Sequence, residues 1–328
     1  MFYSIPSPRS AEVEAPRHRE TPTLNPMADR WDDTERAALV ALLRTRPNGL
    51  SWRDLAREIE QRESALHVWE EHHPPGLFDE ATQNSALHEA ERDIESWHEL
   101  GFLTFMDELY PPQLREIHDF PPVLFHQGKL PSEEVGMAVV GSRQASELGV
   151  TIARAVATGL ADRGITVISG LAKGIDAAAH TAALDSGGRT VAVIGTGITR
   201  HYPAENRRLQ ERIATEGLVI SQFWPDSPPT RQSFPMRNAV MSGYSRATIV
   251  VEAGEHSGAR IQARQAIAHG RPVILTDLVV RNNKWPAELI DRPGVHVAGS
   301  TAEVIAAAEH VVSGPAEIDA LLNLTADR

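Results

Sequence analysis

The sequence contains no cysteine, few aromatic residues and no long hydrophobic run. Without cysteine, disulfide frameworks, thiolate metal sites and cysteine nucleophiles are excluded. No apolar run approaches the roughly 20 residues of a transmembrane helix, and residues 1–27 lack the apolar core of a signal peptide. We therefore expect a cytoplasmic protein with no membrane partner. A hydrophobic content of 41% is typical of a globular chain.

Charge is unevenly distributed within a net charge of −12. Residues 1–135 hold 13 basic and 26 acidic residues, and residues 301–328 hold 1 and 5. The central residues 136–300 hold 18 basic and 13 acidic residues. A local basic field can attract phosphates despite an acidic total. An excess of this size is equally consistent with ordinary scatter, so charge alone does not identify a nucleic-acid-binding protein.

The pattern along the chain predicts four segments. Residues 1–28 are proline-rich and aperiodic, which is typical of a disordered leader. Residues 29–105 predict a small acidic helical domain, because apolar residues recur at helical spacing after Asp32 or Asp33, either of which can cap a helix, and again from about Ser51. Residues 106–300 predict an α/β core, and residues 301–328 a C-terminal helix and tail.

Short apolar strands alternate with helices in the predicted core. Strands rich in valine and isoleucine are typical of a parallel sheet covered on both faces. The spacing favours a Rossmann-like, doubly wound, mostly parallel sheet. Strands are expected at 123–128, 137–140, 165–168, 190–194, 218–221, 247–251 and 272–275. Helices are expected at 147–163, 174–186, 204–216, 234–243, 258–269 and 300–312.

Two of these strands end in glycine-bearing turns. The first turn is Gly141-Ser142-Arg143, in which glycine permits a tight turn and arginine offers a fork for phosphate. The second runs from Ser169-Gly170 through Lys173 and Gly174 to Asp176. Such turns at the carboxyl ends of parallel strands favour a phosphate-binding rim. An ordinary turn with a surface arginine would also explain the first tripeptide.

Asp176 and His180 are four residues apart on one helical face. The pair could serve acid–base chemistry, but a hydrogen bond that ties the helix to its loop fits better, because no nucleophile lies at an obvious spacing. The loop also lacks the Gly-Lys-Ser/Thr ending of a P-loop and the G-x-G-x-x-G pattern of dinucleotide sites. An ATPase or a dehydrogenase is therefore not expected.

Two later segments extend the candidate rim. Arg231, Phe234 and Arg237 interleave cations with an aromatic ring, which suits single strands, although a core phenylalanine with surface arginines is an equal alternative. Ser257 and Gly258 open a helix whose N–H groups could contact an anion.

These motifs, in this order, resemble the DNA-processing protein A family. The resemblance spans about residues 100–275 and implies a Rossmann-like core of the SLOG type, single-stranded DNA binding, homodimers and delivery of strands to a RecA-type recombinase in natural transformation and DNA recombination. It implies no catalysis, cofactor or metal. The residues that it implies for DNA or phosphate contact are Gly141, Ser142, Arg143, Ser169, Gly170, Lys173, Arg231, Phe234, Arg237, Asn238, Ser257, Gly258 and Arg260, with Gly174, Asp176 and His180 as structural motif residues.

Two alternatives stay open. A diverged relative could sense a small phosphorylated nucleotide, as an antitoxin with a cognate toxin or as a phage-defence component. The segment Ala259-Arg260-Ile261-Gln262-Ala263, which replaces the family's aliphatic-Thr-Ala, fits such divergence. A nucleotide phosphoribohydrolase would need a Pro-Gly-Gly-x-Gly-Thr-x-x-Glu motif that is missing, and Glu252 would be its only plausible general base.

Overall fold

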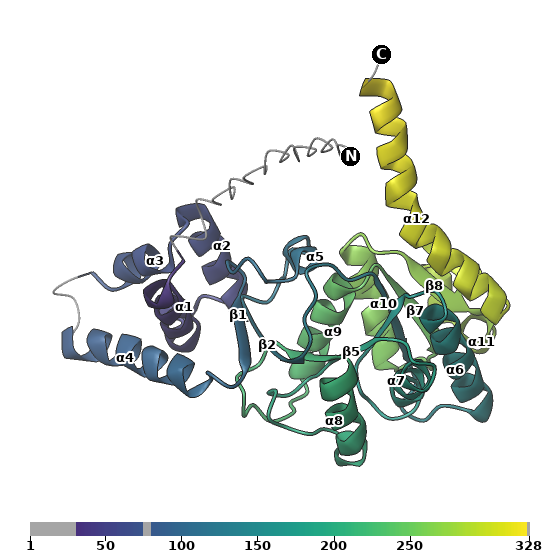
Figure 1. The fold of residues 1–328 in the computed structure, drawn as a ribbon, viewed down its shortest axis with the longest axis horizontal. Helices are drawn as coiled ribbons and strands as arrows, with labels where there is room; N and C mark the ends of the chain where they lie inside the picture. The colour runs from purple at the N-terminus through teal and green to yellow at the C-terminus, as the bar shows by residue number, and fades with distance from the viewer. Residues whose placement is uncertain (1–30, 75–79, 327–328) are drawn as a thin grey trace, which may run out of the picture.

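The computed structural model describes residues 31–74 and 80–326, so the predicted leader lies outside the described residues. They form a nine-stranded sheet flanked by helices on both faces (Figure 1). The strand order is β1-β2-β6-β5-β4-β3-β7-β8-β9. The strands are β1 Gly101–Thr104, β2 Val123–Gly128, β3 Gly136–Gly141, β4 Thr166–Ser169, β5 Thr190–Val193, β6 Leu218–Ser221, β7 Ala247–Glu252, β8 Val273–Thr276 and β9 Val295–Ala298.

The strands from β3 to β9 pair with one another in parallel. At the edge of the sheet, β1 pairs antiparallel with β2, and β2 pairs antiparallel with β6. Every residue of β4, β5, β6 and β8 is buried, because helices cover both faces of the sheet. The predicted mostly parallel, doubly wound sheet is therefore confirmed.

The order of strands changes direction at β3. The chain runs outward from β3 through β4 and β5 to β6, then returns to β7 on the other side of β3 and continues to β8 and β9. The carboxyl ends of β3 and β7 therefore flank the topological switch point, where open α/β sheets hold their ligands.

The helices match the predicted pattern, with additions. Short or exposed elements were not predicted, since they give weak periodic signals: β1 has four residues, and β9 is largely exposed. The short helices at 65–72, 112–115 and 277–282 were also not predicted, and the last helix runs well past its predicted end. The helices are α1 Asp33–Thr45, α2 Trp52–Arg62, α3 Ala65–His72, α4 Glu80–Ser96, α5 Pro112–Arg115, α6 Glu147–Ala161, α7 Ile175–Asp185, α8 Arg207–Glu216, α9 Ser233–Tyr244, α10 Gly258–Ala268, α11 Asp277–Asn282 and α12 Thr301–Ala326.

The N-terminal helices lie at the β1 edge of the sheet (Figure 1). A cluster of aromatic rings joins them to the sheet. Trp97 is the centre of this cluster, with ring centres 5.1 Å from Phe102, 5.0 Å from Phe125 and 5.6 Å from Trp224. Trp52 of α2 reaches the same Trp224 ring at 5.2 Å. The helical segment and the sheet thus share one hydrophobic core, and β1 carries the sheet into the segment predicted to be helical.

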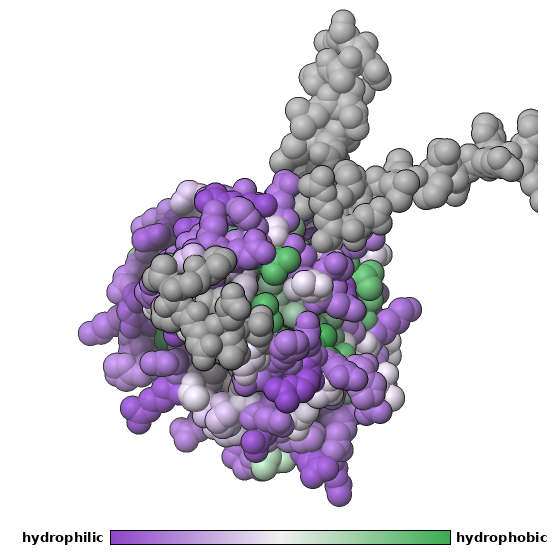
Figure 2. Space-filling view, turned by 90° about the vertical axis from the view of Figure 1, so that its left-hand side faces the viewer, coloured by the Kyte–Doolittle hydropathy of each residue, from purple (hydrophilic) through white to green (hydrophobic). Residues whose placement is uncertain are grey.

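The outer face of these helices is mostly hydrophilic, with only small spots of hydrophobic surface (Figure 2). The apolar stripe of α1, Ala37 to Leu43, is turned inward and buried. Among the helices of residues 31–74 and 80–326, none has both the length and the apolar character needed to cross a bilayer.

Candidate functional site

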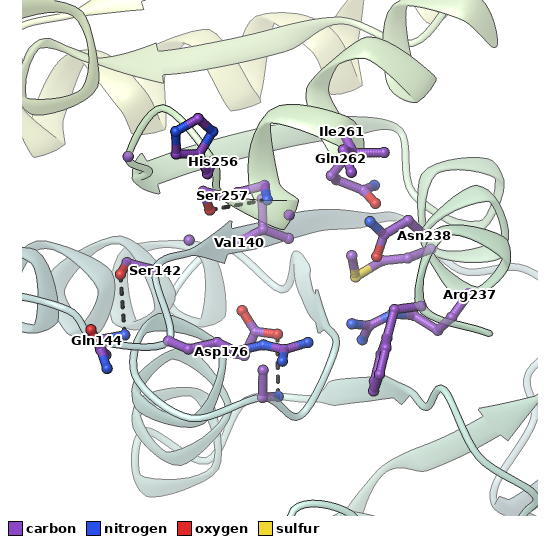
Figure 3. A pocket seen from close by; sticks show the side chains of 18 of the residues that line it. Val140, Ser142, Gln144, Asp176, Arg237, Asn238, His256, Ser257, Ile261 and Gln262 are labelled. Carbon is purple, nitrogen blue, oxygen red and sulfur yellow. Dashed lines mark hydrogen bonds between the residues drawn. The ribbon is translucent and has the colours of Figure 1, made fainter. Parts of the chain in front are cut away.

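A cavity of about 740 Å³ opens at the switch point between β3 and β7 (Figure 3). The turn after β3, the loop after β4, helix α9 and the start of α10 line it. A second cavity of about 80 Å³ lies beside it. The two share Arg143, Ala172, Phe234 and Arg237, so together they form one continuous rim along the carboxyl ends of the strands.

The turn after β3 is held firmly and presents Arg143 to solvent. The Ser142 N–H donates to the Glu252 carbonyl at 2.7 Å, and the Ser142 hydroxyl accepts the Gln144 N–H at 3.1 Å. The guanidinium carbon of Arg143 lies 4.9 Å from the centre of the Phe234 ring. No carboxylate of the described residues lies within ion-pair distance of Arg143, so its charge is available to a ligand.

Phe234 forms the partition between the two cavities. Its ring lies 5.8 Å from the Tyr202 ring, and it fills the space above Gly195, where an added Cβ would stand 2.9 Å from a ring carbon. The cation that lies over the Phe234 ring is Arg143, whereas the sequence pattern paired this ring with Arg231 and Arg237. Arg231 is exposed and lines neither cavity.

The loop after β4 folds back onto the turn after β3. Gly174 has φ +76°, and a Cβ there would lie 2.3 Å from the Ser142 carbonyl oxygen, so only glycine fits this crossing. Buried Asp176 accepts the N–H groups of Gly170 at 3.2 Å and Ala172 at 3.3 Å. Burial raises the pKa of Asp176, while the nearby Arg237 charge opposes that rise. Asp176 therefore shapes the loop. Because the Gly170 N–H is bonded to this carboxylate, it is not free for the predicted phosphate contact.

Arg237 lies beneath this loop rather than on its surface. The residue is 5% exposed, its guanidinium donates to the Val193 carbonyl at 2.8 Å, and it occupies the space that a Gly170 side chain would need. Burial lowers the pKa of Arg237 and Asp176 raises it. Ser169 has no exposed surface and donates to the Val139 carbonyl, so its side chain supports the sheet and lines neither cavity.

Asp176 and His180 were predicted to form a pair that ties the helix to its loop, but each bonds to other partners. His180 is fully buried and shares a 2.7 Å hydrogen bond with Thr190, whose own hydroxyl donates to the Val167 carbonyl at 2.6 Å. The imidazole Nδ1–H is therefore the donor to Thr190. Burial, together with the Arg237 charge, lowers the pKa of His180 to about 3. Both residues hold the loop and helix in place, but through separate hydrogen bonds.

Because the pKa of His180 is low in the folded chain, the free energy of unfolding depends on pH. The unfolded chain binds a proton near the ordinary histidine pKa of 6.5, and the folded chain does so only near pH 3. The contribution of neutral His180 to the free energy of unfolding is fully present above pH 6.5. It is lost as the pH falls toward 3, at about 1.4 kcal/mol per pH unit. We expect urea titrations at several pH values to show a shallower dependence for His180→Asn, and the exposed His98→Asn to keep the slope of the parent chain.

The remaining predicted cations differ in their availability. Lys173 lines the smaller cavity and forms an ion pair with Glu205, whose pKa this hydrogen bond lowers. Arg260 points away from the rim, because it donates to the Glu255 carbonyl at 3.2 Å and lies 3.5 Å from the Glu288 carboxylate. Arg260 lines neither cavity.

The loop after β7 and the start of α10 complete the larger cavity. Ser257 caps α10 by accepting the Ala259 N–H at 3.2 Å, and Gly258 is exposed with open space above it. Glu252, the general base that the sequence suggested for a phosphoribohydrolase, accepts the Ser146 hydroxyl at 2.6 Å and the Ser146 N–H at 3.1 Å. This carboxylate anchors the start of α6 and does not line the cavity.

Sequence reasoning missed several lining residues. Met241 follows Asn238 by one helical turn, and Gln262 follows Gly258 by one helical turn, so helical spacing from the predicted residues could have identified both. Gln144 and His256 lie in loops, where no periodic signal exists. The missed lining side chains include Gln144, Met241, His256 and Gln262.

A family model described as DNA recombination-mediator protein A matches residues 101–314, more than half of the chain. The chain is 44% identical over 171 residues to DNA processing protein DprA of Streptococcus pneumoniae, covering 52% of this chain and 60% of that protein. It is 42% identical over 168 residues to protein Smf of Escherichia coli, covering 51% and 45%. These alignments span about half the length of the curated relatives.

Solved structures of DNA processing protein A also match this chain. DNA processing protein A from Streptococcus pneumoniae aligns with a TM-score of 0.65 and 30% identity, covering 84% of this chain and 95% of that one. A structure that addresses the single-stranded DNA binding mode of DNA processing protein A from Helicobacter pylori aligns with a TM-score of 0.55 and 24% identity, covering 62% and 94%. The second likeness shows the fold alone.

Proposed function

The chain belongs to the DNA recombination-mediator protein A family, and from this premise we propose that it binds single-stranded DNA along the rim between β3 and β7. Strands bound there would be passed to a RecA-type recombinase during DNA uptake or recombination in the cytoplasm. We further propose that the protein acts as a homodimer and without catalysis. Family membership supports these steps, and the single-stranded DNA binding described for the Helicobacter pylori protein agrees with them.

The observation that carries the binding proposal is the Arg143–Phe234 stack at the switch point. It places an exposed guanidinium, with no carboxylate partner in the part of the chain that the structure describes, beside an aromatic ring and between two cavities. Single-strand binding needs a cation for the backbone and a flat surface for the bases. Lys173, at the edge of the smaller cavity, adds a second charge once a phosphate competes with Glu205.

Structural hydrogen bonds of Glu252, Asp176 and His180 support a non-catalytic role for these three groups. Glu252 is bonded to Ser146, Asp176 to two loop N–H groups, and His180 to Thr190. Each of these side chains holds the fold around the rim. A competition experiment distinguishes this function from the alternative, in which the ligand is a small phosphorylated nucleotide. If the alternative holds, a mononucleotide at millimolar concentration would displace the bound oligonucleotide fully.

Binding measured across a salt series tests the proposal. We expect labelled single strands to bind at low salt, with an affinity that falls linearly with the logarithm of salt concentration, because phosphate neutralisation releases counterions. Duplexes of the same length should bind more weakly, because their bases are not available for stacking. Absence of single-strand binding at low salt would refute the proposal.

A further inference from the structure

Two histidines and an aspartate meet at the end of the sheet opposite the rim. His118 and Asp119 follow α5, and His269 ends α10. Each side chain offers one ligand atom, and the three atoms lie within 4.8 Å of one another. Because α10 begins at the rim and rises about 1.5 Å per residue over its 11 residues, this cluster lies about 16 Å from the rim. None of the three residues lines either cavity.

The His269 ring is held at both of its nitrogens. Its side chain is 1% exposed, with Nε2 at 2.7 Å from the Asp119 carboxylate and Nδ1 at 3.0 Å from the Ser242 hydroxyl. When Nδ1–H donates to Ser242, Nε2 turns its lone pair toward the carboxylate, and a cation is needed between the two. That cation is either a proton on the ring or a metal ion. Metal-binding histidines commonly donate their other ring N–H to a neighbouring oxygen in this way.

His118 favours the metal ion over the proton. Its ring is exposed, with its centre 5.2 Å from the centre of the His269 ring. A proton shared between His269 and Asp119 needs no third group, whereas an open zinc site takes three protein ligands at about 2.0–2.2 Å. Tetrahedral ligand atoms at that distance from the metal are about 3.4 Å apart. The exposed His118 ring can move this close without disturbing the core.

The segment that carries the first two ligands is fixed against α9 and α10. A Cβ on Gly243 would lie 2.6 Å from the Ile117 side chain, so this segment packs directly on the backbone of α9. Arg271 donates to the Glu116 carboxylate at 2.6 Å, so its nearby positive charge is neutralised. The C-terminal end of α10 carries partial negative charge, which favours a cation beside it. The scaffold therefore brings the ligands together and does not repel an ion.

We propose that His118, Asp119 and His269 bind a divalent transition-metal ion of the zinc type, with Ser242 as the positioning partner of His269. Imidazole and carboxylate donors suit Zn²⁺, and three protein ligands leave a fourth position for water. The ion would clip the segment before β2 to the ends of α9 and α10. This site is independent of DNA binding at the rim. The sequence did not indicate it, because its ligands come from distant segments and form no spaced motif.

Isothermal titration of the metal-depleted full chain with ZnCl₂ tests the proposal. We expect one Zn²⁺ ion per chain to bind at this cluster and to raise the melting temperature, because it binds only the folded chain. His118→Ala and Asp119→Asn should each weaken this binding at least tenfold, because loss of even an outer-shell partner costs about 10–100-fold. Ser242→Ala should weaken it by about tenfold for that same reason.

The matched control is His98→Ala, which removes an exposed histidine outside the cluster and should leave Zn²⁺ affinity unchanged. Mg²⁺ should bind far more weakly, since it prefers six oxygen ligands. A parent chain that takes up no Zn²⁺ would overturn the site. An affinity that folded His118→Ala and Asp119→Asn both preserve would also overturn it, and would assign the ion to other surface groups. If Asp119→Asn did not fold, His118→Ala, at an exposed position, would decide alone.

Discussion

Replacing Arg143 and Lys173 together with alanine is expected to weaken single-stranded DNA binding by about 100-fold at low salt. Each side chain can give one charge-assisted contact to phosphate, worth about 1.5 kcal/mol or more, and 1.4 kcal/mol corresponds to a factor of ten. Removing two phosphate contacts should also lower the slope of log affinity against log salt by about 1.4. Titration of a labelled single strand at four or more salt concentrations measures both effects.

Two matched variants separate this effect from a general change in charge. Arg154→Ala removes a positive charge from the exposed face of α6 and should leave affinity and slope nearly unchanged. Glu205→Gln frees Lys173 from its carboxylate partner and should tighten binding, which is the opposite direction. If the double alanine variant kept the parent affinity and slope, Arg143 and Lys173 would not be the phosphate contacts.

Trp97→Ala is expected to lower the free energy of unfolding by about 3–5 kcal/mol, the usual cost of removing a large buried aromatic ring. Trp97 is 6% exposed and contacts the rings of Phe102, Phe125 and Trp224. The loss would leave a void between the N-terminal helices and the sheet. Urea denaturation followed by circular dichroism measures it.

The control for this substitution is Leu109→Ala, because Leu109 is 68% exposed and should change stability by no more than about 0.5 kcal/mol. A change below 1 kcal/mol for Trp97→Ala would contradict the shared core. It would mean that the helical segment and the sheet are stabilised independently of each other.

The parallel strands could be predicted because each is short, apolar and buried on both faces. That pattern is clear for residues 218–221 and 273–276. The β9 strand could not be predicted, since two of its four residues are exposed. The short helix 277–282 buries only Val279, so it leaves no apolar stripe in the sequence.

The candidate site was predicted in part. Glycine turns locate a rim because the crossing at Gly174 tolerates no side chain. Sequence cannot show which arginines face that rim: Arg143 and Arg237 line it, Arg260 turns to Glu288, and Arg231 lies outside both cavities. Those directions depend on packing between helices that are far apart in sequence, so only the folded chain shows them.

Ultraviolet cross-linking of the full chain to a bound single strand, followed by mass spectrometry of the peptides, tests the location of binding most directly. Cross-links are expected on peptides that contain residues 141–144 and 234–241, with Phe234 as a principal site, because these segments line the rim. Cross-links confined to the N-terminal helices, residues 33–96, would contradict binding at the switch point.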